Sequence, residues 1–222
     1  MPGFQVAIDG PAGSGKSTIS QKVAKRLNWT HIDTGAMYRA VTLKALRAGI
    51  DLSDPDAYRF LETLDIRYEK DVIFLDSLDV SEEIRSQEVT DNVSLVSSLP
   101  VVREVLVRLQ RASAMDGNIV MDGRDIGTVV LPDADLKVFL NANVIERAKR
   151  RYAEHMRKGK TDPMDKVIED IRTRDRKDST RASSPLRKAD DAIELDTTYL
   201  TVDDVVNKIL ELIDKKEKKH GV

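Results

Sequence analysis

The fold of this chain is decided near its start by Phe4-Gln5-Val6-Ala7-Ile8-Asp9-Gly10-Pro11-Ala12-Gly13-Ser14-Gly15-Lys16-Ser17-Thr18. The apolar run 4–8 predicts a buried strand, and Ile19, Val23 and Leu27 follow at the spacing of a helix. Between strand and helix, residues 10–17 fit the pattern G-x-x-x-x-G-K-[ST] at every position. Average residue usage gives a chance match in about one such chain in a hundred. We therefore interpret this stretch as a phosphate-binding loop.

The residue types of the loop suit a nucleoside triphosphate. Glycines let the backbone curl so that its N–H groups converge on phosphate oxygens, and the helix that follows adds its positive N-terminal end. Lys16 is expected to reach the β- and γ-phosphates, and Ser17 is expected to bind Mg²⁺. The predicted ATP site comprises Gly10, Pro11, Ala12, Gly13, Ser14, Gly15, Lys16, Ser17 and Thr18.

Strands and helices alternate along the rest of the chain, which predicts an α/β fold of the P-loop NTPase type. About five parallel strands are expected, sandwiched by helices, and those after the first are predicted at 30–33, 119–122, 136–140 and 192–196. Helices are predicted at 34–48, 144–157, 164–177 and, at the end of the chain, from 202.

Two segments interrupt this alternation. The β-rich runs 66–68 and 72–75, with Asp76-Ser77 after them, predict a hairpin inside an insert that covers 56–115. The polar, basic stretch 157–163 is interpreted as a short mobile lid. The core is then formed by 1–55 and 116–222, and the insert is expected to bind a nucleoside monophosphate.

Composition sets limits on function. The formal net charge is −2, yet residues 144–188 carry 15 Lys and Arg against 8 Asp and Glu, which suggests a polyanionic ligand met locally rather than a nucleic acid. The absence of cysteine excludes thiolate catalysis and favours a reducing cytoplasm. No long apolar run and no secretory signal is evident, and no apolar helix face argues for assembly, so we expect a monomer away from membranes.

The chain resembles the bacterial cytidylate kinase family from about Val6 to Val206. Beyond the phosphate loop, the resemblance is carried by Asp33-Thr34-Gly35-Ala36-Met37-Tyr38-Arg39, Asp122-Gly123-Arg124-Asp125-Ile126-Gly127-Thr128-Val129-Val130, Arg174-Asp175-Arg176-Lys177-Asp178 with Arg181, and Asp196-Thr197-Thr198. The second of these strings is highly specific. One departure is the hairpin turn Asp76-Ser77, which lacks the glycine often found there.

The resemblance implies transfer of a phosphoryl group from ATP to CMP or dCMP, with Mg²⁺. It places Ser94, Arg103 and Asp125 around the cytosine base, where a carboxylate suits the exocyclic amine and a guanidinium suits the ring acceptors. It gives Asp178 to the ribose hydroxyls. The acceptor phosphate and the sugar are assigned to Thr34, Arg39, Arg124, Arg174 and Arg181, and the catalytic residues to Lys16, Arg124, Arg174 and Arg181. The i, i+4, i+7 spacing predicts that Arg174, Asp178 and Arg181 share one helix face.

Three other functions are left open by the residues. A kinase for an alcohol needs a carboxylate base near the loop, and Asp33 could serve. Another nucleoside monophosphate kinase would differ only in its base contacts. An ATP-dependent switch or RNA-binding module is the third, although aromatic residues are only 5% of the chain. His31, His155 and His220 are scattered, and no catalytic role is assigned to them.

Overall fold

The computed structural model describes residues 2–69, 72–157, 159 and 161–220. Within them, the central element is a five-stranded parallel sheet in the order β2-β6-β1-β7-β8. Its strands are β1 (Pro2–Asp9), β2 (Thr30–Asp33), β6 (Gly117–Gly123), β7 (Leu136–Asn141) and β8 (Ile193–Asp196). The predicted parallel sheet is confirmed, and every predicted strand lies within one residue of an observed strand or inside it.

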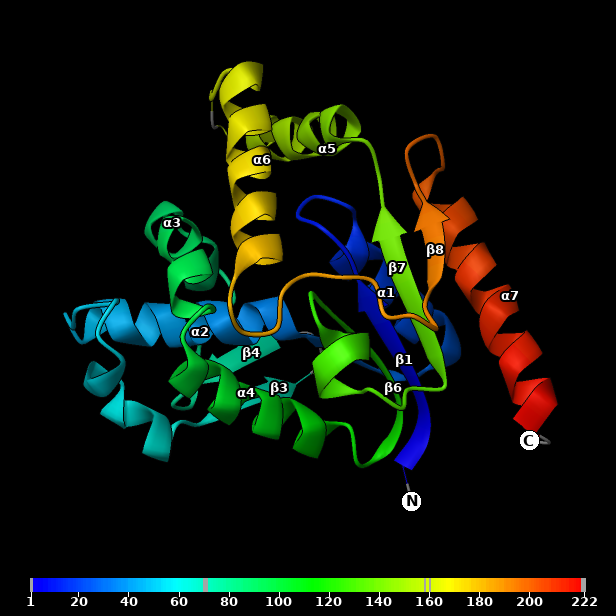
Figure 1. Cartoon of the computed structure of the whole chain (residues 1–222), viewed down its shortest axis with the longest axis horizontal. Coiled ribbons are helices and arrows are strands. Elements are labelled where there is room, and N and C mark those ends of the chain that lie inside the picture. The colour runs from blue at the N-terminus through cyan, green and yellow to red at the C-terminus, as the bar shows by residue number, and fades with distance from the viewer. Residues whose placement is uncertain (1, 70–71, 158, 160, 221–222) are drawn as a thin grey trace.

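Helices cover both faces of this sheet (Figure 1). They are α1 (Lys16–Leu27), α2 (Thr34–Arg47), α3 (Gln87–Val96), α4 (Pro100–Ser113), α5 (Val144–Arg157), α6 (Met164–Thr180) and α7 (Val202–His220). Successive side chains of β1 point to opposite faces, as a strand requires. Ile8 packs among residues of α1 and α7, whereas Ala7 packs among residues of α2 and α4. The apolar run at the start of the chain is therefore buried on both sides.

A second, smaller sheet is antiparallel and has the order β3-β4-β5. Its strands are β3 (Ile66–Glu69), β4 (Val72–Leu75) and β5 (Leu78–Asp79), and Ile73 and Leu75 pack against α2. The predicted hairpin is confirmed. Its turn forms without glycine, because Asp76 (φ 50°) and Ser77 (φ 68°) both adopt the left-handed conformation. Lys44 Nζ lies 2.7 Å from the carboxylate of Asp76 and helps to hold this turn.

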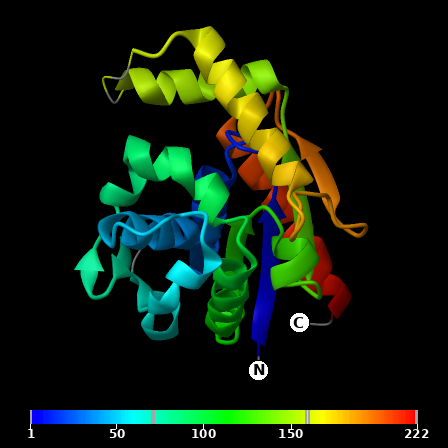
Figure 2. The ribbon, with the colours of Figure 1, turned by 60° about the vertical axis from the view of Figure 1, so that its left-hand side comes forward.

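The carboxyl ends of the parallel strands meet at one edge of the sheet, where ligands bind in folds of this kind. Helices α5 and α6 extend beyond that edge, above α3 (Figure 2). Ala148, Val167 and Ile171 pack these two helices together. The predicted lid at 157–163 joins them, and its residues 158 and 160 lie outside the described part of the chain. Short helical turns complete the fold at η1 (Pro55–Ala57), η2 (Arg59–Thr63), η3 (Glu83–Arg85) and η4 (Ile126–Val130).

Candidate functional site

The predicted phosphate loop connects β1 to α1. Its first glycine is required by a close approach, because a Cβ on Gly10 would lie 2.1 Å from the Leu140 carbonyl oxygen. Lys16 is buried and folds back over the loop, where its Nζ donates to the Pro11 carbonyl at 2.8 Å. Burial, with repulsion from Arg124, holds the pKa of Lys16 well below its usual range. An anion in the loop would relieve both effects.

Three side chains whose oxygen atoms could bind a metal ion lie together beside the loop: Ser17, Asp33 and Asp122. The Ser17 hydroxyl donates to Asp122 Oδ2 at 2.8 Å. Asp33 Oδ2 lies 3.4 Å from Ser17 Oγ. On its other side, Asp122 Oδ1 lies 2.8 Å from His31 Nε2. Burial and repulsion from Asp122 raise the pKa of Asp33. Two adjoining carboxylates that repel each other and a hydroxyl fit a Mg²⁺ ion that also binds substrate phosphates.

Opposite the loop is a cleft of about 540 Å³, bounded by α3 on one side and by α5 and α6 on the other. Ala12 and Gly13 of the loop line it, together with the four guanidinium groups of Arg39, Arg85, Arg151 and Arg174. Burial, with repulsion from Arg124 and Arg39, lowers the pKa of Arg174 to about 9. Burial, with repulsion from Arg151, lowers the pKa of Arg39 to about 10. Partly desolvated cations that repel one another suit a bound anion.

Arg174 has an additional feature of an anion site. Its Nε is buried and has no hydrogen-bond partner among the described residues. Arg39, in contrast, donates to the Ile84 carbonyl and to Thr90 Oγ1, both at 3.0 Å. A buried donor without an acceptor is costly, so a ligand oxygen at Arg174 would be stabilising.

A second group of polar side chains lies at Asp125, directly after β6. Asp125 is buried and accepts from Arg103 Nη2, and Arg181 Nη2 approaches its other oxygen at 3.4 Å. Burial raises the pKa of Asp125, although both guanidinium groups oppose this shift. The Tyr38 ring faces the Arg103 guanidinium, with 5.4 Å from the ring centroid to Cζ. The predicted base-binding residues Arg103 and Asp125 are thus brought together, although 22 positions separate them.

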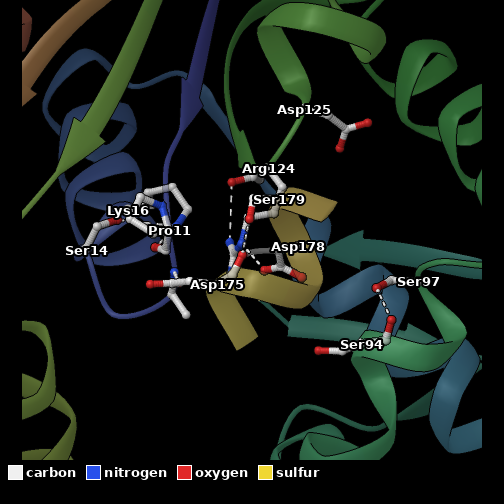
Figure 3. Close-up of polar contacts among 12 residues, drawn as sticks. Pro11, Ser14, Lys16, Ser94, Ser97, Arg124, Asp125, Asp175, Asp178 and Ser179 are labelled. Carbon is white, nitrogen blue, oxygen red and sulfur yellow. Dashed lines mark hydrogen bonds and ion pairs between the residues drawn. The ribbon is translucent and has the colours of Figure 1, made fainter. Parts of the chain in front are cut away.

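Arg124 and Asp178 form a third pair, with 2.9 Å between Arg124 Nε and Asp178 Oδ2. Burial opposes ionisation of Asp178, but Arg124 and Arg174 outweigh burial and hold its pKa below the usual value. Figure 3 shows this pair between the phosphate loop and Ser94 of α3, with Asp125 pointing away from it. Ser94 lines the cleft, and its carbonyl accepts from Ser97 Oγ. Thr34, at the start of α2, donates to the Asp122 carbonyl at 2.8 Å.

One structural prediction at the site is wrong. Arg174 and Asp178 lie on α6, but Arg181 follows its last residue and has extended dihedral angles (φ −63°, ψ 143°). The three side chains therefore do not share a helix face. Because the chain turns at Arg181, its Nε donates to the Ser184 carbonyl at 2.5 Å while its Nη2 approaches Asp125. Sequence spacing continued the helix by one residue beyond the point where it ends.

Several polar residues of the site were given no role in the sequence analysis. Asp9 is buried, and its two oxygens accept from the N–H groups of Ile126 and Gly127, both at 2.8 Å. Asp122, quoted in the sequence only as part of a motif, and the α5 residues Arg147, Arg150 and Arg151 were given no role either. The positions of Asp9 and Asp122 at the carboxyl ends of β1 and β6 could have identified them, because that edge carries the site.

The sheet, the phosphate loop and the anion-binding cleft define the class of protein as a P-loop phosphotransferase. A model of the cytidylate kinase family matches residues 6–215. The chain is 57% identical to a cytidylate kinase of Acholeplasma laidlawii over 96% of each chain. It is 53% identical to a cytidylate kinase of Listeria monocytogenes, over 95% of this chain and 96% of the relative. The chain belongs to the cytidylate kinase family and is thus a nucleoside monophosphate kinase.

The likeness to solved structures concerns the fold alone. A crystal structure of an uncharacterized protein from Eubacterium ventriosum aligns with a TM-score of 0.52 and 14% identity, over 95% of this chain and 98% of that chain. Among the described residues, no helix is long and apolar enough to cross a membrane. The described part of the chain also contains no group of three or more His, Cys, Asp or Glu side chains placed to hold a metal.

Proposed function

We propose that the protein transfers the γ-phosphoryl group of ATP to CMP or dCMP. The observation that carries this proposal is the cluster of guanidinium groups, three of them half-buried, that lines one cleft together with the phosphate loop. A pocket that places lowered-pKa arginines opposite a phosphate loop suits two anionic substrates in line. An uncharged alcohol would bring no negative charge to Arg39 and Arg174, and the buried Nε of Arg174 would gain no anionic acceptor.

On the donor side, the backbone N–H groups of the loop and Lys16 bind the ATP phosphates. Ser17 with Asp122 and Asp33 would hold Mg²⁺, which when bound neutralises charge on the transferring phosphoryl group. Lys16 breaks its hydrogen bond to Pro11 and donates to the phosphates instead. The low pKa of the lysine in the free protein then rises, because the phosphates supply the missing counter-charge.

On the acceptor side, Arg39, Arg124 and Arg174 hold the phosphate of CMP, and Thr34 lies beside it. Asp178 accepts from the ribose hydroxyls. Asp125 accepts from the cytosine amine, while Arg103 and Ser94 contact the ring acceptors. Uracil would place a carbonyl oxygen against the Asp125 carboxylate, so the site rejects UMP by electrostatic repulsion. Arg181 keeps Asp125 in place and reaches toward the phosphate.

The transfer needs no general base. A phosphate monoester has lost most of its second proton at neutral pH, because that proton has a pKa near ~6. Catalysis then depends on alignment and on charge neutralisation by Lys16, Arg124, Arg174 and Arg181. The insert 56–115 and the lid at 157–163 close over the nucleotides and exclude water, which limits ATP hydrolysis.

The test is an ADP-release assay with purified protein, ATP, Mg²⁺ and each common ribo- and deoxyribonucleoside monophosphate. CMP and dCMP are expected to support turnover at least about tenfold faster than UMP, because the amine and the carbonyl differ in their fit to Asp125. Omission of Mg²⁺ with excess chelator removes the activity. Conversion of shikimate or gluconate, with every pyrimidine monophosphate left unchanged, would overturn the proposal.

A further inference from the structure

Asp175 of α6 and Arg147 of α5 grip the phosphate loop from outside. Asp175 Oδ1 accepts from the Ala12 backbone N–H at 3.2 Å, and Arg147 Nη1 donates to the Ala12 carbonyl at 2.9 Å. The same Arg147 nitrogen lies 2.6 Å from Asp175 Oδ2. Both backbone groups of one loop residue are thus held by one ion pair. Figure 3 shows Asp175 between the α6 ribbon and the loop that carries Pro11, Ser14 and Lys16.

The loop is also pressed closely against α5. A Cβ on Gly13 would lie 3.3 Å from the Arg147 carbonyl oxygen, and Gly13 has a φ of 74°. One helical turn after Arg147, Arg150 Nη1 donates to the Ser14 carbonyl at 3.3 Å. Arg147 is buried, and its Nε is held by the Ala142 carbonyl at 2.9 Å. The hydrogen bond to Ala142 therefore fixes the orientation of the Arg147 guanidinium that contacts the loop.

The neighbour of Asp175 on α6 gives this arrangement a function. Arg174, with its buried Nε free of a partner among the described residues, faces the cleft. Two consecutive residues of α6 thus have different contacts: Asp175 binds the phosphate loop, and Arg174 faces the cleft where the acceptor would bind. Any shift of α6 relative to the loop would change the distance between Arg174 and the phosphates. Misplacement by about 1 Å costs on the order of 100-fold in rate.

We infer that Arg147 and Asp175 form a clamp that fixes the distance between the phosphate loop and Arg174. The clamp residues are positioning residues and touch no reacting atom. This inference rests on the proposed function for its effect on turnover. The clamp acts on the alignment of two bound substrates, so its loss lowers kcat more than it raises either KM.

The main test compares Asp175→Ala and Arg147→Gln with two matched controls on the same helices. Glu169→Gln removes one exposed carboxylate from α6, and Lys149→Gln removes one exposed cation from α5. Each clamp variant is expected to lower kcat by about 10- to 100-fold, with each KM changed by less than about threefold. The controls remain within about twofold of the parent protein. A clamp variant within the control range, or one that changes only KM, overturns the inference.

Amide hydrogen exchange supplies a readout that needs no turnover. The Ala12 N–H is protected by Asp175, so the segment 10–15 should exchange at least about tenfold faster in Asp175→Ala than in the control Glu169→Gln. Equal exchange in both variants overturns the clamp. If the parent protein converts no monophosphate, the proposed function fails, and this measurement still decides whether the clamp exists.

A conservative variant and a double variant separate the two contacts of Asp175. Asp175→Asn keeps an oxygen for the Ala12 N–H and loses the charge that pairs with Arg147, so its kcat should lie between those of the parent and Asp175→Ala. The double variant Arg147→Gln/Asp175→Ala should be about as slow as the slower single variant, because the residues act as one unit. Fully additive losses would show independent roles and overturn the clamp. Because Asp175→Asn retains its shape and one bond, it also serves if Asp175→Ala does not fold.

Discussion

The phosphate loop and the predicted acceptor residues both contain cations, but the contacts of these cations differ. On the donor side, Lys16 donates to the Pro11 carbonyl, and Arg147 donates to the Ala12 carbonyl and also pairs with Asp175. On the acceptor side, Arg103 pairs with Asp125 and Arg124 pairs with Asp178. The donor loop is thus held mainly through its backbone groups, by Lys16 and by the Arg147–Asp175 pair, whereas the acceptor residues are held by ion pairs between their own side chains.

This difference teaches how each side gains its specificity. A loop built from N–H groups and one lysine binds any triphosphate, because it reads only charge and the spacing of oxygens. In the proposed function, the carboxylates of Asp125 and Asp178 among the acceptor residues recognise the cytosine base and the ribose. Selectivity among monophosphates is therefore expected to depend only on the acceptor residues, that is, on the pairs Arg103–Asp125 and Arg124–Asp178.

The largest expected effect comes from the donor side, with Lys16→Ala. Loss of a buried cation that contacts the transferring phosphates should lower kcat by at least about 1,000-fold, because stabilisation of the transition state is lost. The fold should be unaffected, since burial of the charged lysine is itself unfavourable. Steady-state turnover with circular dichroism as a check measures both. Near-normal turnover would show that this loop does not bind the donor.

The second effect tests whether base selectivity belongs to the acceptor residues. Asp125→Ala should lower the ratio of kcat/KM for CMP to that for UMP by about 100-fold, because the carboxylate that rejects uracil is removed. The variant also leaves Arg103 and Arg181 without their counter-charge, so Asp125→Asn is measured beside it to limit the loss of stability. An unchanged ratio in both variants would place base recognition elsewhere.

A smaller effect is expected at the ribose. Asp178→Ala should raise the KM for CMP by about tenfold, as expected for a lost hydrogen bond to a charged group, and should reduce the difference between CMP and dCMP. Glu169→Gln on the same helix is the control, because Glu169 is exposed. If neither KM nor the ribose preference changes, Asp178 serves only to pair with Arg124.

The smallest effect concerns Asp9. This residue immediately precedes the phosphate loop, and its carboxylate accepts from the backbone N–H groups that follow Asp125. Burial outweighs its two backbone hydrogen bonds and raises its pKa from 3.8 to about 6. Between pH 3.8 and about 6, Asp9 is protonated in the folded protein but ionised in the unfolded chain. The free energy of unfolding therefore rises as the pH falls through about 6, and this contribution is lost as the pH rises again. Relative to Asp9→Asn, the parent should gain about 1 kcal/mol in free energy of unfolding between pH 7.5 and pH 5. Denaturant titrations at both pH values measure it. A parallel pH dependence in the two proteins would contradict the raised pKa.

Much of the fold could be predicted because its signals are local. The alternation of apolar runs identified the strands of the sheet, and the glycine pattern identified the loop from eight consecutive residues. The hairpin was also predicted, although its turn uses Asp76 and Ser77 at positive φ without glycine. Spacing failed at Arg181, because the residue that ends a helix is decided by contacts with Ser184 and Asp125 rather than by periodicity.

The sequence alone determined the parallel α/β architecture and the phosphate loop. It also identified candidate acceptor residues through the resemblance to the cytidylate kinase family. Only the tertiary structure decided which of those residues meet, and it showed the contacts made by Asp9, Asp122, Arg147 and Asp175. The physical reason is that a loop motif encodes its own backbone geometry within a few residues. Ion pairs such as Arg103 with Asp125 and Arg124 with Asp178 depend on where separate helices and strands pack, and that position is fixed only by the folded core.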